Sequence, residues 1–172
     1  NVVIVGSIMA VSPPFDSLVL PLQNAVEMAV EDFNKEAQLP NGQKLAWIAC
    51  DSKGNTDLAK TAAEHLVATG APAIVGPIFS EEVLAVATDV TIPAGVFLIT
   101  PTGSNKNITA LNDNDLVWRT ISSDVYQASA IANRLEVVPD EKLAALPLGP
   151  LTFDNMVIVH KNDAYGNDLA ND

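Results

Sequence analysis

Hydroxyl groups follow two apolar segments of the chain, where they could hold a small anion or polar molecule. Ser80 comes after "AIVGPIF", and Thr102, Gly103 and Ser104 come after "GVFLIT" and Pro101. Hydroxyls, the unpaired N–H groups of a first helical turn and a glycine that admits a ligand to the main chain together suit a carboxylate. The alternative for Ser80 is simple capping of the helix that follows, and for the other residues an ordinary turn.

Alternating strands and helices position these residues. Short β-branched runs predict strands, and apolar residues spaced by three and four predict helices. The predicted strands cover residues 2–8, 44–50, 73–76, 96–100, 116–120 and 155–160, and the predicted helices cover residues 20–37, 57–69, 80–89 and 124–135. This order predicts an α/β fold: a parallel sheet with helices on both faces and the strand order 2-1-3-4 of flavodoxin-like sheets. Ligands bind at the carboxyl ends of such strands, so the hydroxyl-bearing loops are expected to converge.

The chain divides into two predicted units. Residues 1–120 are expected to form a ligand-binding lobe, and residues 121–172 to begin a second α/β lobe. Residues 137–154 are rich in proline and lack a clear period, which predicts a surface insertion. The second unit contains a single predicted strand, and so small a sheet is marginal in water. We therefore expect an N-terminal fragment of a longer protein, with exposed apolar surface that favours self-association.

Charge and composition exclude some classes of partner. The chain has 9 Lys and Arg against 21 Asp and Glu, a net charge of -12, which disfavours binding to nucleic acid. No apolar run approaches the ~20 residues of a membrane-spanning helix. The single cysteine, Cys50, excludes an internal disulfide. The absence of a leader fits a cytosolic protein and also an exported protein whose signal peptide has been removed.

The sequence gives little support to catalysis or to metal and cofactor chemistry. His65 falls within a helical segment and His160 at a strand end, and neither stands beside a serine or cysteine that it could activate. The segment "DSKGNTD" is similar to a calcium loop, but Lys53 occupies a ligand position and the closing glutamate is missing. The glycine-rich nucleotide motifs are absent. We expect no reaction, metal or cofactor, and an enzyme of flavodoxin-like or hydrolase type is the distant alternative.

Six segments, in the same order along the chain as in a known family, indicate a family resemblance. They are "AVEMAVEDFN", "ACDSKGNTDLAKTAAEHLV", "AIVGPIFS", "GVFLITPTGSN", "VWRTISSDVYQASAIA" and "VIVHKNDAYGNDLA". In this order they resemble the leucine/isoleucine/valine-binding family of type I periplasmic binding proteins, the substrate-capture subunits of ABC importers. The resemblance covers nearly the whole chain except the insertion.

The resemblance implies a two-lobed protein that closes on its ligand about a hinge. It implies that two serine hydroxyls and the backbone of the neighbouring threonine and glycine hold the carboxylate and ammonium of an amino acid. It also implies that a tyrosine of the second lobe closes over the ligand and that a phenylalanine of the first loop contacts it. The ligand-binding residues so implied are Ser80, Thr102, Gly103, Ser104, Tyr165 and Phe15.

The resemblance further implies export to the periplasm or cell exterior and delivery of ligand to a membrane ABC permease. The alternative is a sensory ectodomain of the same fold that reports its ligand to a signalling partner. Glu81 and Glu82 follow the ligand serine directly, and acids within a Debye length of ~8 Å weaken anion binding. The ligand therefore stays open among amino acids and related small polar metabolites.

Overall fold

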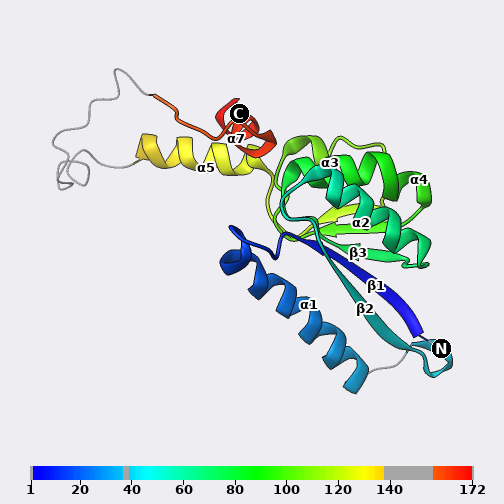
Figure 1. The fold of residues 1–172 in the computed structure, drawn as a ribbon. Coiled ribbons are helices and arrows are strands. Elements are labelled where there is room, and N and C mark those ends of the chain that lie inside the picture. The colour runs from blue at the N-terminus through cyan, green and yellow to red at the C-terminus, as the bar shows by residue number, and fades with distance from the viewer. Residues whose placement is uncertain (1, 37–38, 138–156, 172) are drawn as a thin grey trace.

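The computed structural model describes residues 2–36, 39–137 and 157–171 (Figure 1). Within these residues, five strands form one parallel sheet in the order β2-β1-β3-β4-β5. Its strands are β1 (Val2–Met9), β2 (Lys44–Asp51), β3 (Ala73–Val75), β4 (Phe97–Thr100) and β5 (Val117–Arg119). The predicted parallel α/β fold and its 2-1-3-4 order are confirmed, and β5 extends the sheet beyond β4.

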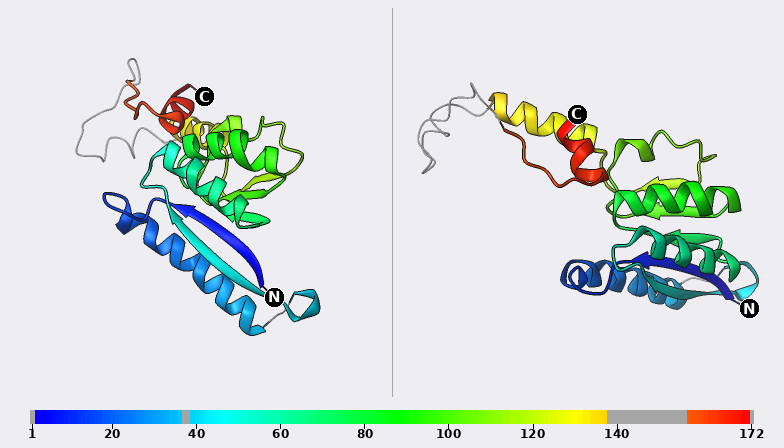
Figure 2. Two further views of the ribbon diagram at one scale, coloured as in Figure 1. Left: turned by 45° about the vertical axis from the view of Figure 1, so that its right-hand side comes forward. Right: turned by 45° about the horizontal axis from the view of Figure 1, so that its top comes forward.

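Helices cover both faces of the sheet, as predicted (Figures 1 and 2). Helix α1 lies on one face of β1 and β2, and α2 and α3 lie on the other, while α5 and α7 project from the end toward which the strands point. The α-helices are α1 (Asp16–Glu36), α2 (Thr56–Ala68), α3 (Ser80–Val86), α4 (Ile92–Ala94), α5 (Asp124–Val137) and α7 (Ala164–Asn171). Shorter helical pieces are η1 (Pro40–Gly42), η2 (Ala87–Thr91) and η3 (Lys106–Ile108). None of the described helices is both long and apolar enough to cross a membrane.

Each face of the sheet has its own core. On one face, α2 and α3 bury Ala63, Leu66 and Val83 against strand residues such as Ile74 and Leu98. On the other face, the first turns of α1 pack against the carboxyl ends of the strands, through Met9, Ala10, Val19 and Ile78. The second cluster therefore fixes the loops that follow β1 and β3, where the site was predicted.

Two predicted helix boundaries are wrong. Helix α1 begins at Asp16 and not near Leu20, and it runs through Pro21. An acidic residue in the first turn favours this earlier start, and Val19, in the turn before Pro21, is buried against the strand ends. The helix that starts at Ser80 continues past Asp89 through the π-helical η2 and through α4, and it ends at Gly95, whose φ is 68°.

The predicted strand at residues 155–160 does not form in its described part. Residues 157–160 have no strand structure, and Val157 and Val159 are 84% and 91% exposed. Within the described residues no neighbouring strand pairs with this segment, and an unpaired strand is not stable. The predicted insertion lies outside the described residues except for Val137, which ends α5. The boundary between the two units and the self-association stay predictions.

Candidate functional site

A cavity of about 500 Å³ is lined by residues that follow β3 and β4 and by residues of the segment that contains α7. We call it the strand-end cavity. Apolar side chains make most of its wall, and hydroxyl, amide and charged groups make the remainder. Its lining residues are Phe15, Leu18, Val19, Leu22, Ile78, Phe79, Ser80, Thr102, Ser104, Ile121, Gln127, Lys161, Asp163 and Tyr165.

Ser80 enters the cavity from the first turn of α3, but it does not cap this helix. The N-cap position belongs to Phe79, and α3 has no side-chain capping hydrogen bond. The expected N-cap role of Ser80 is therefore wrong by one residue. Its Oγ instead accepts a hydrogen bond from the N–H of Asn105 at 3.3 Å. This contact joins the loop after β3 to the loop after β4, so the two loops do converge.

Thr100 and Thr102 hold the same two loops together. The hydroxyl of the buried Thr100 donates to the carbonyl of Pro77 at 2.6 Å and accepts the N–H of Gly103 at 2.9 Å. The hydroxyl of Thr102 donates to the carbonyl of Ile78 at 2.6 Å. Because that proton is already donated, the Thr102 oxygen can offer only lone pairs to a ligand.

Gly103 was predicted to bind the ligand, but it is absent from the lining of the cavity although Thr102 and Ser104 on either side line it. Thr100 already accepts the N–H of Gly103. A Cβ added at this position would lie 3.0 Å from both Thr100 Oγ1 and Val83 Cγ2. The glycine therefore allows close packing of the loop on α3, and its N–H is not offered to a ligand as expected.

Ser104 is buried and lines the cavity beside Asp124. Its carbonyl accepts hydrogen bonds from the Asp124 N–H at 2.9 Å and from Arg119 Nη1 at 3.2 Å, which fixes its main chain. Burial raises the pKa of the Asp124 carboxyl, and the Ser104 hydroxyl opposes that rise by hydrogen bonding. Asp168 contributes further to the raised pKa through its negative charge.

Phe15 forms an aromatic wall together with Phe79. Their ring centroids are 4.9 Å apart, with an angle of 65° between the planes. Asp51, at the end of β2, tethers the loop before Phe15 because it accepts the Ser12 hydroxyl at 2.5 Å and the Val11 N–H at 3.0 Å. Burial alone would raise the pKa of Asp51, but these bonds and one from the Lys53 N–H lower it. Asp51, the first residue of the segment that is similar to a calcium loop, thus holds the loop after β1 in place.

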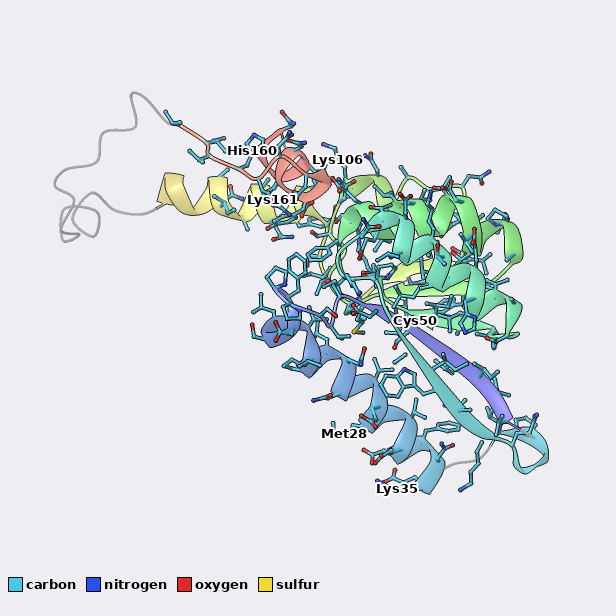
Figure 3. All side chains as sticks on the ribbon, viewed as in Figure 1. Met28, Lys35, Cys50, Lys106, His160 and Lys161 are labelled. Atoms are coloured by element: carbon cyan, nitrogen blue, oxygen red, sulfur yellow. The ribbon has the colours of Figure 1, made fainter. Side chains whose placement is uncertain are left out.

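Tyr165 reaches the cavity from α7 and is 42% exposed. Lys161, on the segment that leads into α7 (Figure 3), also lines the cavity. Its Nζ lies 2.6 Å from Asp163 Oδ2 and 5.8 Å from the centre of the Phe79 ring. Hydrogen bonding to Asp163 raises the pKa of Lys161. Burial alone would raise the pKa of Asp163, but Lys161 and the Gly166 N–H lower it. The α7 side of the cavity thus carries a paired cation and anion.

Sequence reasoning missed several lining residues. Leu18 and Val19 were assigned to a loop because α1 was expected to begin later. A usable signal was Asp16, an acid that suits a first helical turn. Gln127 and Lys161 lie far from the other lining residues in sequence, and no local pattern marks them.

Neither histidine lines the strand-end cavity. His65 lies on an exposed part of α2, and His160 is exposed, with Nδ1 3.1 Å from the carbonyl of Lys161. Within the part of the chain that the structure describes, no cluster of three or more His, Cys, Asp or Glu side chains could hold a metal ion. The groups that face the cavity suit hydrogen bonding and apolar contact with a small molecule.

An apolar cavity with convergent polar groups, at the carboxyl edge of a parallel sheet, defines an α/β ligand-binding domain. The sequence pattern of the family described as "Periplasmic binding protein" matches residues 2–172. The chain belongs to this family. The expected resemblance to leucine/isoleucine/valine-binding proteins is confirmed by the named relatives that follow.

A curated relative, the Leu/Ile/Val-binding protein homolog 3 of Brucella melitensis, is 28% identical over 167 residues, covering 96% of this chain and 41% of that protein. An ABC transporter substrate-binding protein from Desulfitobacterium hafniense, solved with leucine, has a TM-score of 0.74 at 24% identity, covering 99% of this chain and 45% of that one. LivJ from Streptococcus pneumoniae, solved with isoleucine, has a TM-score of 0.71 at 22% identity, covering 80% and 38%. The structural likeness shows the fold, and the chain spans about two-fifths of these proteins' length.

Proposed function

We propose that the protein is an extracytoplasmic solute-binding protein that captures an amino acid, or a close chemical relative, for an ABC importer. One observation chiefly supports this proposal: Ser80, Thr102 and Ser104, which follow the ends of neighbouring strands, line one cavity with apolar walls. The relatives, which are named as Leu/Ile/Val-binding and branched-chain amino acid transport proteins, support the same ligand class.

The hydroxyl groups suit the two charged ends of a zwitterion. Ser80 Oγ accepts the Asn105 N–H, so its own proton is free to be donated to a ligand carboxylate. The Thr102 hydroxyl has donated its proton to Ile78, so its oxygen can only accept, as an ammonium group requires. One donor and one acceptor at the same end of a cavity thus match an α-amino acid head group better than a simple carboxylic acid.

The remaining wall suits an apolar side chain. The apolar side chains that line the cavity include Phe15, Leu22, Ile78 and Phe79. An aliphatic or aromatic side chain loses water there at about 25 cal/mol for each Å² of apolar surface buried. Tyr165 also lines the cavity, and we expect its ring to contact the ligand.

Capture and release need only these noncovalent contacts, so the proposed role includes no chemical step. The corresponding location is the periplasm or the cell exterior, and the corresponding partner is a membrane ABC permease.

Calorimetry and thermal-shift assays on the full-length protein test the proposal, with L-leucine, L-isoleucine, L-valine and L-phenylalanine as ligands. A ligand at 100 times its Kd adds about 2.7 kcal/mol to the free energy of unfolding. The deamino analogue 4-methylpentanoate should bind more weakly than leucine, because it leaves the Thr102 acceptor unpaired. The proposal fails if no amino acid raises the melting temperature.

Ser80→Ala tests the named contact. A hydrogen bond to a charged group is worth about 1.5–3 kcal/mol, so the affinity should fall by about 10- to 160-fold. Ser129→Ala is the matched control, because Ser129 is exposed on α5 and does not line the cavity. Equal affinities of the two variants would remove Ser80 from the site.

A further inference from the structure

Glu81 stands directly after the ligand-binding serine of the proposed function, where a free carboxylate would repel a ligand carboxylate. In the structure this carboxylate instead accepts a hydrogen bond from α7. Its Oε1 accepts the N–H of Ala164 at 2.9 Å, between residues 83 positions apart in the sequence. Ala164 is the first residue of α7, and the first N–H groups of a helix have no partner within the helix. The carboxylate of Glu81 on α3 thus accepts the first backbone N–H of α7.

The same alanine is held from its other side. Asn105 Nδ2 donates to the carbonyl of Ala164 at 2.7 Å, and Asn105 Oδ1 accepts the Asn107 N–H at 2.8 Å. Asn105 is buried, so its side chain has little freedom to move. The two peptide groups of Ala164 are therefore fixed by two side chains, one from α3 and one from the loop after β4. Tyr165 is the next residue, and its Cα follows at about 3.8 Å.

Further contacts keep α7 in the same register. Asp168, one turn after Ala164, accepts the Lys106 N–H at 2.6 Å and lies 3.3 Å from Lys106 Nζ. Figure 3 shows Lys106 where α7 meets the sheet unit. Gly166 allows the close approach of the preceding loop, because a Cβ there would overlap the carbonyl of Lys161. The helix is thus seated on the loop after β4, and Glu81 fixes its first residue.

We propose that Glu81 is a positioning residue for ligand binding: through its hydrogen bond to Ala164 it holds Tyr165 at the strand-end cavity. This inference rests on the proposed function, since it assigns the residue that places one wall of that site. Lys161 is also near, but its ammonium is bound to Asp163 at 2.6 Å, and the hydrogen bond from Ala164 to Glu81 is made by the main chain.

Hydrogen exchange tests the placement without any ligand. In the full-length protein, Glu81→Ala should increase the exchange rate of the Ala164 amide by about tenfold or more, because its acceptor is gone. The Gly166 amide, which Asp163 Oδ1 accepts at 2.8 Å, is an internal reference and should stay protected. Glu81→Gln keeps an acceptor oxygen and should keep the protection of Ala164. Unchanged exchange of Ala164 in Glu81→Ala would overturn the inference.

Binding of L-leucine by calorimetry tests the consequence. Glu81→Ala should weaken binding by about tenfold, and Glu81→Gln should restore most of that loss. If Glu81 acts through Tyr165, then Glu81→Ala should add nothing in a Tyr165→Ala background. Glu64→Ala, at an exposed position of α2, is the charge-matched control and should leave the affinity unchanged.

The outcomes separate the two proposals. Additive losses in the double variant, or Glu81→Gln as weak as Glu81→Ala, would overturn the positioning role while leaving amino-acid binding intact. Failure of the wild-type protein to bind leucine would count against the proposed function, whereas the exchange experiment would still decide whether Glu81 holds α7.

Discussion

Replacing Glu82 with glutamine should stabilise the protein at neutral and alkaline pH. Glu82 is 1% exposed, in the first turn of α3, and within the described residues neither of its carboxyl oxygens has a hydrogen-bond partner. Burial raises the pKa of this carboxyl, and the charges of Asp51 and Glu81 add to the rise. The Ser52 hydroxyl and the Phe79 N–H lie near enough to oppose the rise only in part. An ionised Glu82 is therefore destabilising in the folded state.

The size and sign of the effect follow from this environment. A buried polar group without a partner costs about 1–3 kcal/mol, and more when it is charged. Glutamine removes the charge but keeps a polar amide, so we expect a gain of about 1 kcal/mol. Because the folded-state pKa is raised, the folded protein keeps a proton that the unfolded chain releases. The unfolding free energy of the wild type therefore falls as pH rises between the ordinary pKa of glutamate and the raised value.

Urea unfolding from pH 4 to pH 8 measures the prediction. At pH 8 the midpoint for Glu82→Gln should exceed that of the wild type by about 0.5 M, for an m value of about 2 kcal/mol/M. The difference should shrink toward pH 4, where both side chains are neutral. Glu64→Gln removes the same charge at an exposed position of α2 and should change stability by less than about 0.5 kcal/mol. A destabilised Glu82→Gln, or a difference independent of pH, would refute the reasoning.

Three further substitutions or reactions test the packing around the site. Thr100→Val should destabilise the protein by about 1–3 kcal/mol in urea unfolding, because the Gly103 N–H and the Pro77 carbonyl lose their partner; an unchanged midpoint would contradict this. Gly166→Ala should displace α7 and weaken leucine binding in calorimetry, because the new Cβ overlaps the carbonyl of Lys161; wild-type affinity would show that α7 need not be seated. Burial raises the pKa of the Cys50 thiol, so this thiol should react with iodoacetamide more slowly than free cysteine at pH 8, and an equal rate would disagree with the structure.

The strands were predictable because they carry their own signal, and their order followed from the alternation of strands and helices that is typical of flavodoxin-like sheets. Segments such as 2–9 and 73–75 are apolar on both faces, as buried parallel strands are. The start of α1 was not predictable from its apolar stripe, because Leu18 and Leu20 are exposed and interrupt the period. The segment 157–160 carries a strand signal of the same kind, but a strand forms only with a neighbour to pair with.

The site was predictable where it depends on strand ends and not where it depends on side-chain partners. Parallel neighbours bring their carboxyl ends together, so the convergence of Ser80 and Ser104 followed from the sheet alone. Whether a backbone N–H in these loops is available to a ligand depends on its hydrogen bonds to side chains, which the sequence does not reveal. Gly103 was expected to offer its N–H, but the hydroxyl of Thr100 accepts it.

The two acids after Ser80 show why local sequence misjudges electrostatics. In sequence, Glu81 and Glu82 are equivalent negative charges beside an anion site. Successive helical residues point about 100° apart, so one side chain faces α7 and the other faces the interior. Hydrogen bonding to α7 engages the charge of Glu81, and burial favours the neutral form of Glu82. The repulsion expected from the sequence is therefore weakened on both residues, and a carboxylate ligand beside Ser80 is compatible with this acidic chain.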